Sequence, residues 1–204
     1  MSNVVRRKLG SLGRQLKSAA VVTGVSFGLL WIVEVVDLVI FGSGLDAYGV
    51  HPRSLVGLAG VLTMPFLHGG FLHLLSNTVA GVPLAFLSME RRRSDFFVVS
   101  AVTAVTAGLG AWLFGSTGSV HIGASGVVFG LLGFLMARGF YERRVVPILL
   151  SVFVGTVWGS MLIGLVPGLF AGISWQAHLF GFLGGVGVAR FLGRKLRQKP
   201  RSRS

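Results

Sequence analysis

Long stretches without charged side chains constrain what this chain can fold into more than any other feature. Residues 54–89 contain no Asp, Glu, Lys or Arg, and neither do residues 145–189. A helix crosses the hydrocarbon core of a bilayer with about 20 mostly apolar residues. Charged residues make up 12% of the chain, about half their usual share in a soluble domain. The pattern therefore predicts a membrane protein and excludes an ordinary soluble enzyme.

Six segments of membrane-spanning length fit between the charged clusters, which predicts an all-α, polytopic bundle of six transmembrane helices. The fourth segment is short, but Gly139–Tyr141 extends it beyond Arg138. The bundle is expected to occupy residues 19–193, between a basic N-terminal segment at 1–18 and a basic tail at 194–204. The predicted spans are Ala19–Phe41, Phe71–Met89, Phe96–Phe114, Ala124–Ala137, Val145–Leu165 and Ser174–Leu192.

The basic residues predict the orientation of these spans. Eighteen of the 19 fall near the N-terminus, in two turns between spans, and at the C-terminal end. Because cytoplasmic loops are enriched in Lys and Arg, these four places are predicted to be cytoplasmic. Arg53 alone lies in a predicted outer loop. The outer loops are then Gly42–Gly70, Gly115–Gly123 and Val166–Ile173.

This distribution predicts a multi-pass plasma-membrane protein with both termini in the cytoplasm, and the absence of a transit peptide favours a prokaryote. A nucleic-acid-binding domain gathers its basic residues on one face of a folded module. Here they separate apolar stretches, so we expect membrane lipids and no nucleic acid as partners. The basic tail is expected to contact anionic lipid. The apolar part of the first outer loop, Leu55–Leu67, is expected to lie in the interface or to re-enter the protein.

Polar side chains inside membrane helices are costly, so each one is a candidate for function. His73, Ser125 and His178 lie on the second, fourth and sixth predicted spans, which all begin at the outer surface. At a rise of about 1.5 Å per residue, all three lie within roughly 10 Å of that surface. Three polar groups on three helices therefore share one depth, which favours a common site.

Small residues would let the helices of Ser125 and His178 pack closely. Gly126 follows the serine, and Gly181 and Gly185 lie on the histidine's face of the sixth span. Because glycine faces allow backbones to approach, the serine hydroxyl is expected to reach a ring nitrogen of the histidine. Such a pair is a nucleophile beside a general base. No acidic residue in the spans is placed to orient the histidine, so we expect a dyad rather than a triad.

A set of hydrogen-bond donors faces this pair. His73 and Asn77 lie four residues apart and so share one helix face. The backbone N–H of Ser125, at the start of its span, has no acceptor within its own helix. Donors of this kind stabilise the oxyanion of acyl transfer. A metal-dependent hydrolase is disfavoured, because an H-E-x-x-H pattern is absent and no carboxylate lies near His68, His73 or His178 in sequence. We therefore expect neither a metal nor an organic cofactor.

Three motifs together resemble the rhomboid family of intramembrane serine proteases, and they extend over the six-span core. They are His68-Gly-Gly-Phe-Leu-His73-Leu-Leu-Ser-Asn77, Gly123-Ala-Ser125-Gly126 and Ala177-His178-Leu-Phe-Gly181-Phe-Leu-Gly-Gly185. The resemblance implies that Ser125 is the nucleophile and His178 the general base. It also implies an oxyanion hole made of His73, Asn77 and the Ser125 amide, and substrates that are transmembrane segments of other proteins.

The resemblance assigns supporting roles as well. His68 matches a further family histidine with a structural or water-binding role, and Glu90 matches an acidic residue that anchors the cytoplasmic end. Phe129 stands where many members carry a tyrosine that packs on the histidine, so it keeps the stacking surface and loses the hydroxyl. The Trp-Arg pair that many members carry in the first outer loop is absent. The supporting glycines are Gly123, Gly126, Gly181 and Gly185.

Two alternative functions remain open. A catalytically inactive rhomboid-like protein would bind membrane helices, although it would not need an intact serine and histidine. A small proton-coupled transporter would use Glu34 and Asp37, which lie three residues apart on the first span, but no second acidic set or inverted repeat accompanies them. We expect these two carboxylates to hydrogen-bond to the first loop instead. His51 and His121 are expected to be loop residues.

Overall fold

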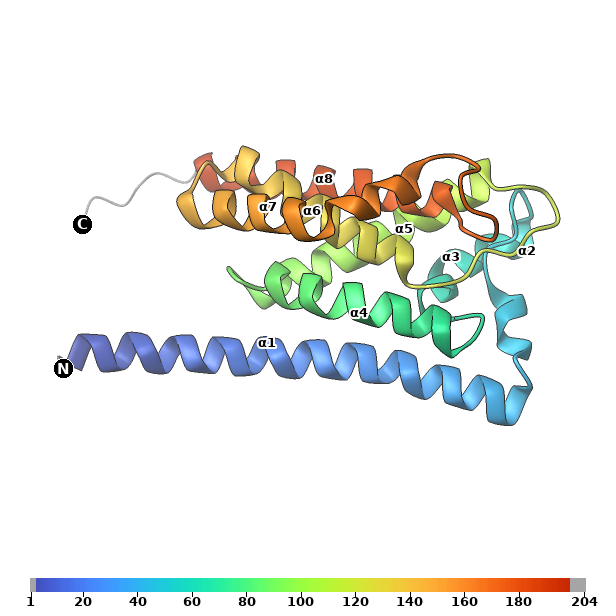
Figure 1. The fold of residues 1–204 in the computed structure, drawn as a ribbon, viewed down its shortest axis with the longest axis horizontal. Helices are drawn as coiled ribbons and strands as arrows, with labels where there is room; N and C mark the ends of the chain where they lie inside the picture. The colour runs from blue at the N-terminus through green and yellow to red at the C-terminus, as the bar shows by residue number, and fades with distance from the viewer. Residues whose placement is uncertain (1–2, 199–204) are drawn as a thin grey trace.

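The computed structural model describes residues 3–198, which form six long helices and several short ones (Figure 1). α1 (Asn3–Val36) packs along α4 (Phe71–Ser88), and the other long helices gather around α6 (Ser125–Glu142). No strand occurs among the described residues, so the predicted all-α class is confirmed. The other helices are α2 (Leu55–Leu58), α3 (Gly60–Thr63), α5 (Arg93–Phe114), α7 (Val145–Trp158) and α8 (Trp175–Gln198), with short π or 3₁₀ turns at η1 (Asp37–Phe41), η2 (Gly44–Tyr48), η3 (Met64–Phe66) and η4 (Gly159–Leu165).

Each predicted span coincides with a long helix, although not all six are equally apolar. α6 and α8 contain glycines, polar residues and charged ends, which lower their hydropathy. Much of α6 is enclosed by its neighbours, so it needs little apolar surface toward lipid. The membrane crossing of α6 and α8 stays a prediction. Among the described residues, four segments are long and apolar enough to cross a membrane: Val5–Phe41, Phe71–Ser88, Arg93–Phe114 and Val145–Leu165.

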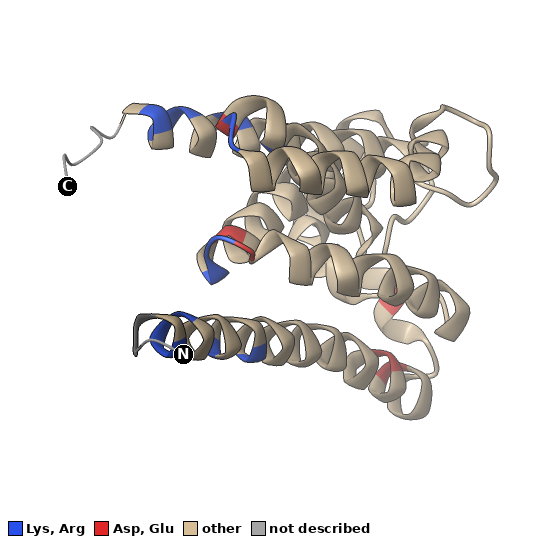
Figure 2. Cartoon of the chain, turned by 60° about the vertical axis from the view of Figure 1, so that its left-hand side comes forward, with Lys and Arg blue, Asp and Glu red and all other residues tan. Residues whose placement is uncertain are grey.

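The terminal helices are longer than predicted. α1 begins at Asn3 rather than near Ala19, so most of the basic N-terminal segment belongs to the first helix. α8 continues to Gln198, and residues 199–204 of the predicted tail lie outside the described residues. The basic residues at the start of α1 and the end of α8 lie at the same end of the bundle, as the blue segments of Figure 2 show. This placement agrees with the predicted orientation, and the side of the membrane stays a prediction.

α6 forms the centre of the bundle. Leu131, Leu132, Phe134 and Leu135 are at most 1% exposed. α4, α5, α7 and α8 all pack against this helix. In a bilayer such contacts stabilise the fold through close packing rather than through removal of apolar surface from water. The position of α6 therefore depends on how well its small and large side chains fit its neighbours.

Glycines bring the backbones of α6 and α8 into contact, as their sequences predict. Gly181 lies against the carbonyl of Gly126, and Gly185 lies against the carbonyl of Gly130. A Cβ atom on Gly181 or Gly185 would overlap these carbonyls. Because the two helices cross this closely, side chains near their N-termini are brought within hydrogen-bond distance.

The predicted first outer loop, residues 42–70, folds back onto the bundle. Val61 of α3 and Met64 of η3 are buried together with Ala107 and Ala111 of α5. Leu55, on the opposite side of this segment, is exposed. The segment therefore lies against α5 with one apolar side free, and its predicted location in the membrane interface stays a prediction.

Ion pairs join α4, α5 and α6 at the end of the bundle where α1 begins. Arg138 is 1% exposed, and its guanidinium lies 2.7 Å from Glu90 and 2.7 Å from Glu142. Arg91 pairs with Asp95 at 2.9 Å. A buried charge that loses its partner is strongly destabilising, so these carboxylates fix where the ends of the three helices meet.

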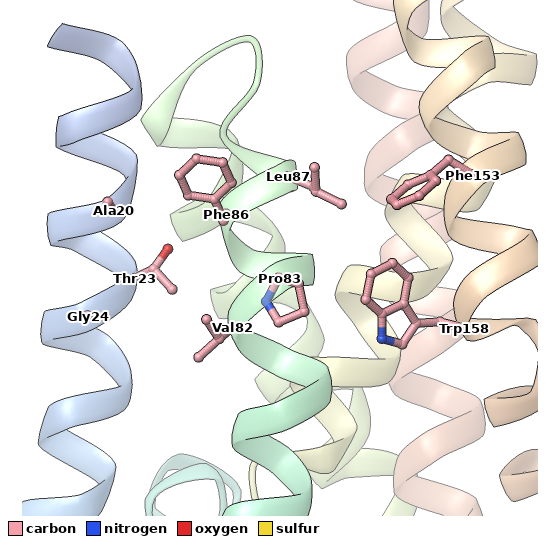
Figure 3. Close-up of a pocket in the computed structure, with 9 residues that line it drawn as sticks. All are labelled: Ala20, Thr23, Gly24, Val82, Pro83, Phe86, Leu87, Phe153 and Trp158. Atoms are coloured by element: carbon pink, nitrogen blue, oxygen red, sulfur yellow. The ribbon is translucent and has the colours of Figure 1, made fainter. Parts of the chain in front are cut away.

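An apolar cavity of about 500 Å³ opens between α1, α4 and α7 (Figure 3). Figure 3 shows Pro83 of α4 on the side toward Trp158, and Thr23 on the α1 side. Pro83 is six residues, or about 9 Å, further along α4 than Asn77. The cavity therefore lies deeper than the polar candidate residues, none of which lines it.

Replacing Gly185 by alanine should destabilise the bundle, because the added methyl group meets the backbone of α6. We expect a loss of about 1–3 kcal/mol, as for other overpacked sites, measured as a lower thermal midpoint by tryptophan fluorescence in detergent. Gly187→Ala is the matched control, since a Cβ atom there meets nothing within 4 Å. Equal midpoints for the two variants would contradict the backbone contact of α6 and α8.

Candidate active site

Ser125 is the first residue of α6, and its side chain is half-buried. Gly123, two residues earlier, has φ +113°, a conformation that side chains rarely adopt. The N–H of Gly123 donates to the Met64 carbonyl at 2.9 Å, which ties this turn to the first outer loop. The Ser125 N–H then stands at a helix start, where it has no acceptor within α6.

The hydroxyl of Ser125 lies 2.9 Å from Nε2 of His178. On the other side of the ring, Nδ1 lies 3.1 Å from the carbonyl oxygen of Gly164. A carbonyl only accepts hydrogen bonds, so Nδ1 carries the proton of the neutral ring and Nε2 has a free lone pair. The serine hydroxyl therefore donates to a nitrogen that is ready to take its proton.

Phe129 and Gly164 hold the ring of His178 in place. The rings of Phe129 and His178 stack with their centroids 4.1 Å apart and their planes inclined by 12°. A Cβ atom on Gly164 would lie 3.0 Å from the Phe129 ring and 3.4 Å from His178 Nδ1. Phe129 thus provides the stacking surface that the resemblance implied. Because Gly164 has no side chain, η4 can pack directly against both rings.

His73 and Asn77 of α4 converge on the turn before Ser125. A Cβ atom on Gly123 would lie 2.8 Å from His73 Nε2 and 3.8 Å from Asn77 Nδ2. Asn77 Nδ2 is buried and has no hydrogen-bond partner. The Gly69 N–H donates to His73 Nδ1 at 3.4 Å, so the proton of a neutral His73 ring is on Nε2. Two side-chain donors therefore lie against the turn that precedes Ser125, and the Asn77 donor has no acceptor of its own.

His68 fixes the backbone directly before the serine. Its Nε2 accepts a hydrogen bond from the N–H of Ala124 at 3.2 Å, and the residue is 1% exposed. Burial, and to a lesser extent the nearby His73, lowers the pKa of His68 to about 4. The ring therefore stays neutral near pH 7, which keeps Nε2 able to accept.

The two carboxylates of the first span make hydrogen bonds with the backbone of the loop between α1 and α4. Asp37 accepts a hydrogen bond from the Leu45 N–H at 2.9 Å, in the first outer loop, as predicted. Glu34 is buried near the same end of α1. Among residues 3–198, no group of three or more His, Cys, Asp or Glu side chains is arranged to hold a metal ion.

Two contributors were missed from the sequence. Gly164 acts through its backbone carbonyl, which gives no side-chain signal. His121 is a loop residue, as predicted, but its burial was not anticipated: it is 9% exposed and its ring lies between Ser119 and Ser174. A histidine four residues before the serine is the only feature of the sequence that hinted at it.

Comparisons with known proteins identify the family. A family model described as the Rhomboid domain matches residues 52–195. An uncharacterized protein of Mycobacterium tuberculosis (strain H37Rv) is 40% identical over 171 residues, which cover 80% of this chain and 70% of that protein. The Bacillus subtilis protein named "Putative rhomboid protease YdcA" is 29% identical over 127 residues, which cover 61% of this chain and 62% of that protein. RHOMBOID-like protein 5 of Arabidopsis thaliana is 30% identical over 145 residues, 66% and 43% of the two chains.

This chain therefore belongs to the rhomboid family. Membership confirms the family expected from the three motifs and identifies a membrane-embedded protein of protease or protease-like type. The bacterial relatives support the predicted prokaryotic origin.

Acid should weaken the fold through His68. Its folded-state pKa of about 4 lies below the value of 6.5 in an unfolded chain, so between these values the unfolded state binds more protons. Stability should then fall as pH drops from 6.5 to 4, by at most about 1.4 kcal/mol per pH unit from this residue. Denaturant unfolding at pH 7 and pH 5 measures the effect. His68→Gln should lose less stability over this interval than the wild type, and parallel losses would contradict the assignment.

Proposed function

We propose that this protein is an intramembrane serine endopeptidase that cleaves transmembrane segments of other membrane proteins. The observation that carries the proposal is the 2.9 Å contact between Ser125 Oγ and His178 Nε2, with His178 Nδ1 on the Gly164 carbonyl. Family membership supports a protease-type function. An inactive helix-binding relative would have no need of a hydroxyl and an imidazole in this relation.

The first chemical step transfers a proton and forms a bond. His178 Nε2 takes the hydroxyl proton while Ser125 Oγ attacks the substrate carbonyl carbon, which gives a tetrahedral oxyanion. The same imidazolium then gives its proton to the leaving amine as the peptide bond breaks. The acyl-enzyme on Ser125 is hydrolysed when His178 activates a water molecule, which releases the acid and restores the serine.

The oxyanion would be held by three donors. Asn77 Nδ2, which lacks an acceptor, and His73 Nε2 both lie beside Gly123 in the turn before the serine, and the Ser125 N–H completes the set. Donors that are already in place stabilise negative charge without reorganising during the reaction. The unpartnered Asn77 amide is a cost in the resting protein that the reaction would relieve.

The imidazolium would be stabilised without a carboxylate. The Gly164 carbonyl accepts from His178 Nδ1, and the face of Phe129 lies 4.1 Å from the ring. A cation over an aromatic face gains from the ring quadrupole. These neutral partners hold the ring in one tautomer and support its charge, which is the role of the acid in a triad.

The substrate is proposed to enter from the membrane and to unwind near the outer surface. A peptide bond inside a helix is shielded by its own hydrogen bonds, so segments with Gly, Pro or other small residues suit the site best. Ser125 begins α6, and His73 and Asn77 lie in the first two turns of α4. The starts of these two helices lie at the end of the bundle away from the basic termini (Figures 1 and 2). Cleavage would therefore take place near the outer face of the plasma membrane, where water can reach the acyl-enzyme.

Ser125 should be the residue that reacts with a fluorophosphonate probe. The probe phosphonylates serines that have an adjacent base, with loss of fluoride, so detergent-purified wild type should be labelled, whereas Ser125→Ala and His178→Ala should not. In-gel fluorescence and mass spectrometry of the labelled peptide measure this. Ser116→Ala is the control. Ser116 is an exposed serine in the loop between α5 and α6, and this variant should label as the wild type does.

Label that persists in Ser125→Ala would reject Ser125 as the nucleophile, and an unlabelled, folded wild type would favour the inactive relative. Proton-coupled uptake that is lost in Glu34→Gln would favour the transporter instead.

Removing the Asn77 amide should slow the chemical step. We expect Asn77→Ala to lower kcat about 100-fold or more with little change in KM, as for loss of one oxyanion donor. The measurement uses a quenched single-span peptide with a Gly- and Ala-rich outer end, in proteoliposomes. Ser76→Ala, the exposed neighbour on α4, is the control. A variant that raises KM while kcat stays constant would place Asn77 in substrate binding instead.

A further inference from the structure

His121 lies four residues before Ser125 and is held between two hydroxyl groups. Its Nδ1 is 2.7 Å from Ser174 Oγ, and its Nε2 is 2.9 Å from Ser119 Oγ. The ring is buried in the loop that connects α5 to α6. No step of the proposed reaction uses this histidine.

Ser174, the partner of His121 before α8, has the same spacing to His178 as His121 has to Ser125. Ser174 lies four residues before His178, and its carbonyl accepts the His178 N–H at 3.1 Å. The His121–Ser174 bond therefore joins the same two segments as the Ser125–His178 bond. Each of its residues lies four positions before the corresponding residue of that pair. Together the two hydrogen bonds fix the start of α8 against the segment that leads into α6.

The hydrogens in this group can be assigned from the donors. Ser174 Oγ accepts the Ala177 N–H at 3.4 Å, so its own proton is free to go to His121 Nδ1. Ser119 Oγ donates to the Ser116 carbonyl at 2.6 Å, so it accepts the proton of His121 Nε2. With His121 neutral, each side-chain proton of Ser119, His121 and Ser174 then has an acceptor. Burial lowers the pKa of His121, which favours that form.

The main chain of His121 is fixed as well. Its N–H and carbonyl both pair with Val50 at 2.9 Å. In the first turn of α8, the Gln176 side chain donates to the Phe114 carbonyl at 3.0 Å, which ties the start of α8 to the end of α5. His121 is therefore a rigid point on one segment that holds the first turn of the other.

We propose that His121 is a positioning residue for the Ser125–His178 pair, acting through Ser174 at the start of α8. The inference rests on the proposed function. A dyad has no carboxylate to aim its imidazole, so the aim depends on where the two helices begin. A misplacement of about 1 Å is enough to slow an enzymatic step about 100-fold.

Substitutions can separate the role of His121 Nδ1, which contacts Ser174, from that of Nε2, which contacts Ser119. In His121→Asn, the side-chain oxygen can take the place of Nδ1 and accept from Ser174. In His121→Gln, the longer amide reaches the place of Nε2 and contacts Ser119 instead. Only the asparagine keeps the bond to α8, so only it should keep the site aligned.

The test measures the rate at which a fluorophosphonate probe labels Ser125, per folded molecule, together with the thermal midpoint of each variant. We expect His121→Leu, His121→Gln and Ser174→Ala to label at least about tenfold more slowly than the wild type, and His121→Asn within about threefold of it. Ser119→Ala is the control and should label at the wild-type rate. The double variant His121→Leu/Ser174→Ala should be no slower than the slower single variant, because both remove the same bond. With a single-span peptide substrate, the loss should be in kcat rather than KM.

Each outcome separates the inference from the proposed function. If the wild type is not labelled at Ser125, the proposed function fails. If Ser125 is labelled but the His121→Leu rate per folded molecule equals that of the wild type, the positioning role is wrong and the residue only stabilises the fold. If His121→Leu does not fold, the asparagine and glutamine variants decide, and equal rates for the two overturn the proposal.

Discussion

The backbone contact between α6 and α8 is the constraint on which the rest of the structure depends. Gly181 and Gly185 lie against carbonyls of α6, at a separation that no side chain allows. Lipid offers no hydrophobic drive for helices to associate, so close packing has to hold them together. Since both helices start at the same end, this contact also brings a serine and a histidine 53 residues apart in sequence to 2.9 Å.

Around this contact, the polar groups of the site are held by neutral partners. Placing a carboxylate beside His178 would add a charge in a region where unpaired charge is costly. The structure uses the Gly164 carbonyl and the Phe129 ring instead, while the charged pairs of Arg138 stay at the opposite end. Asn77 keeps a buried donor without an acceptor, which is an exception to the usual pairing of buried polar groups. Such an exception is expected where charge develops during a reaction.

Much of this arrangement could be predicted from the sequence, because it depends on spacing along helices. The glycine faces predicted the contact of Ser125 with His178, and the interval of four placed His73 and Asn77 on one face. Gly164 could not be predicted, since a backbone carbonyl leaves no mark in the sequence. His121 was missed because its partners depend on the path of two loops. The helix starts were misjudged at α1, where basic residues mark the expected membrane boundary without ending the helix.

A structure of the adduct between the protein and a fluorophosphonate, which imitates the tetrahedral intermediate, would test the proposed site most directly. We expect phosphorus bonded to Ser125 Oγ, with the phosphoryl oxygen about 3 Å from both Asn77 Nδ2 and His73 Nε2. An adduct on another residue, or a phosphoryl oxygen turned away from both donors, would contradict it.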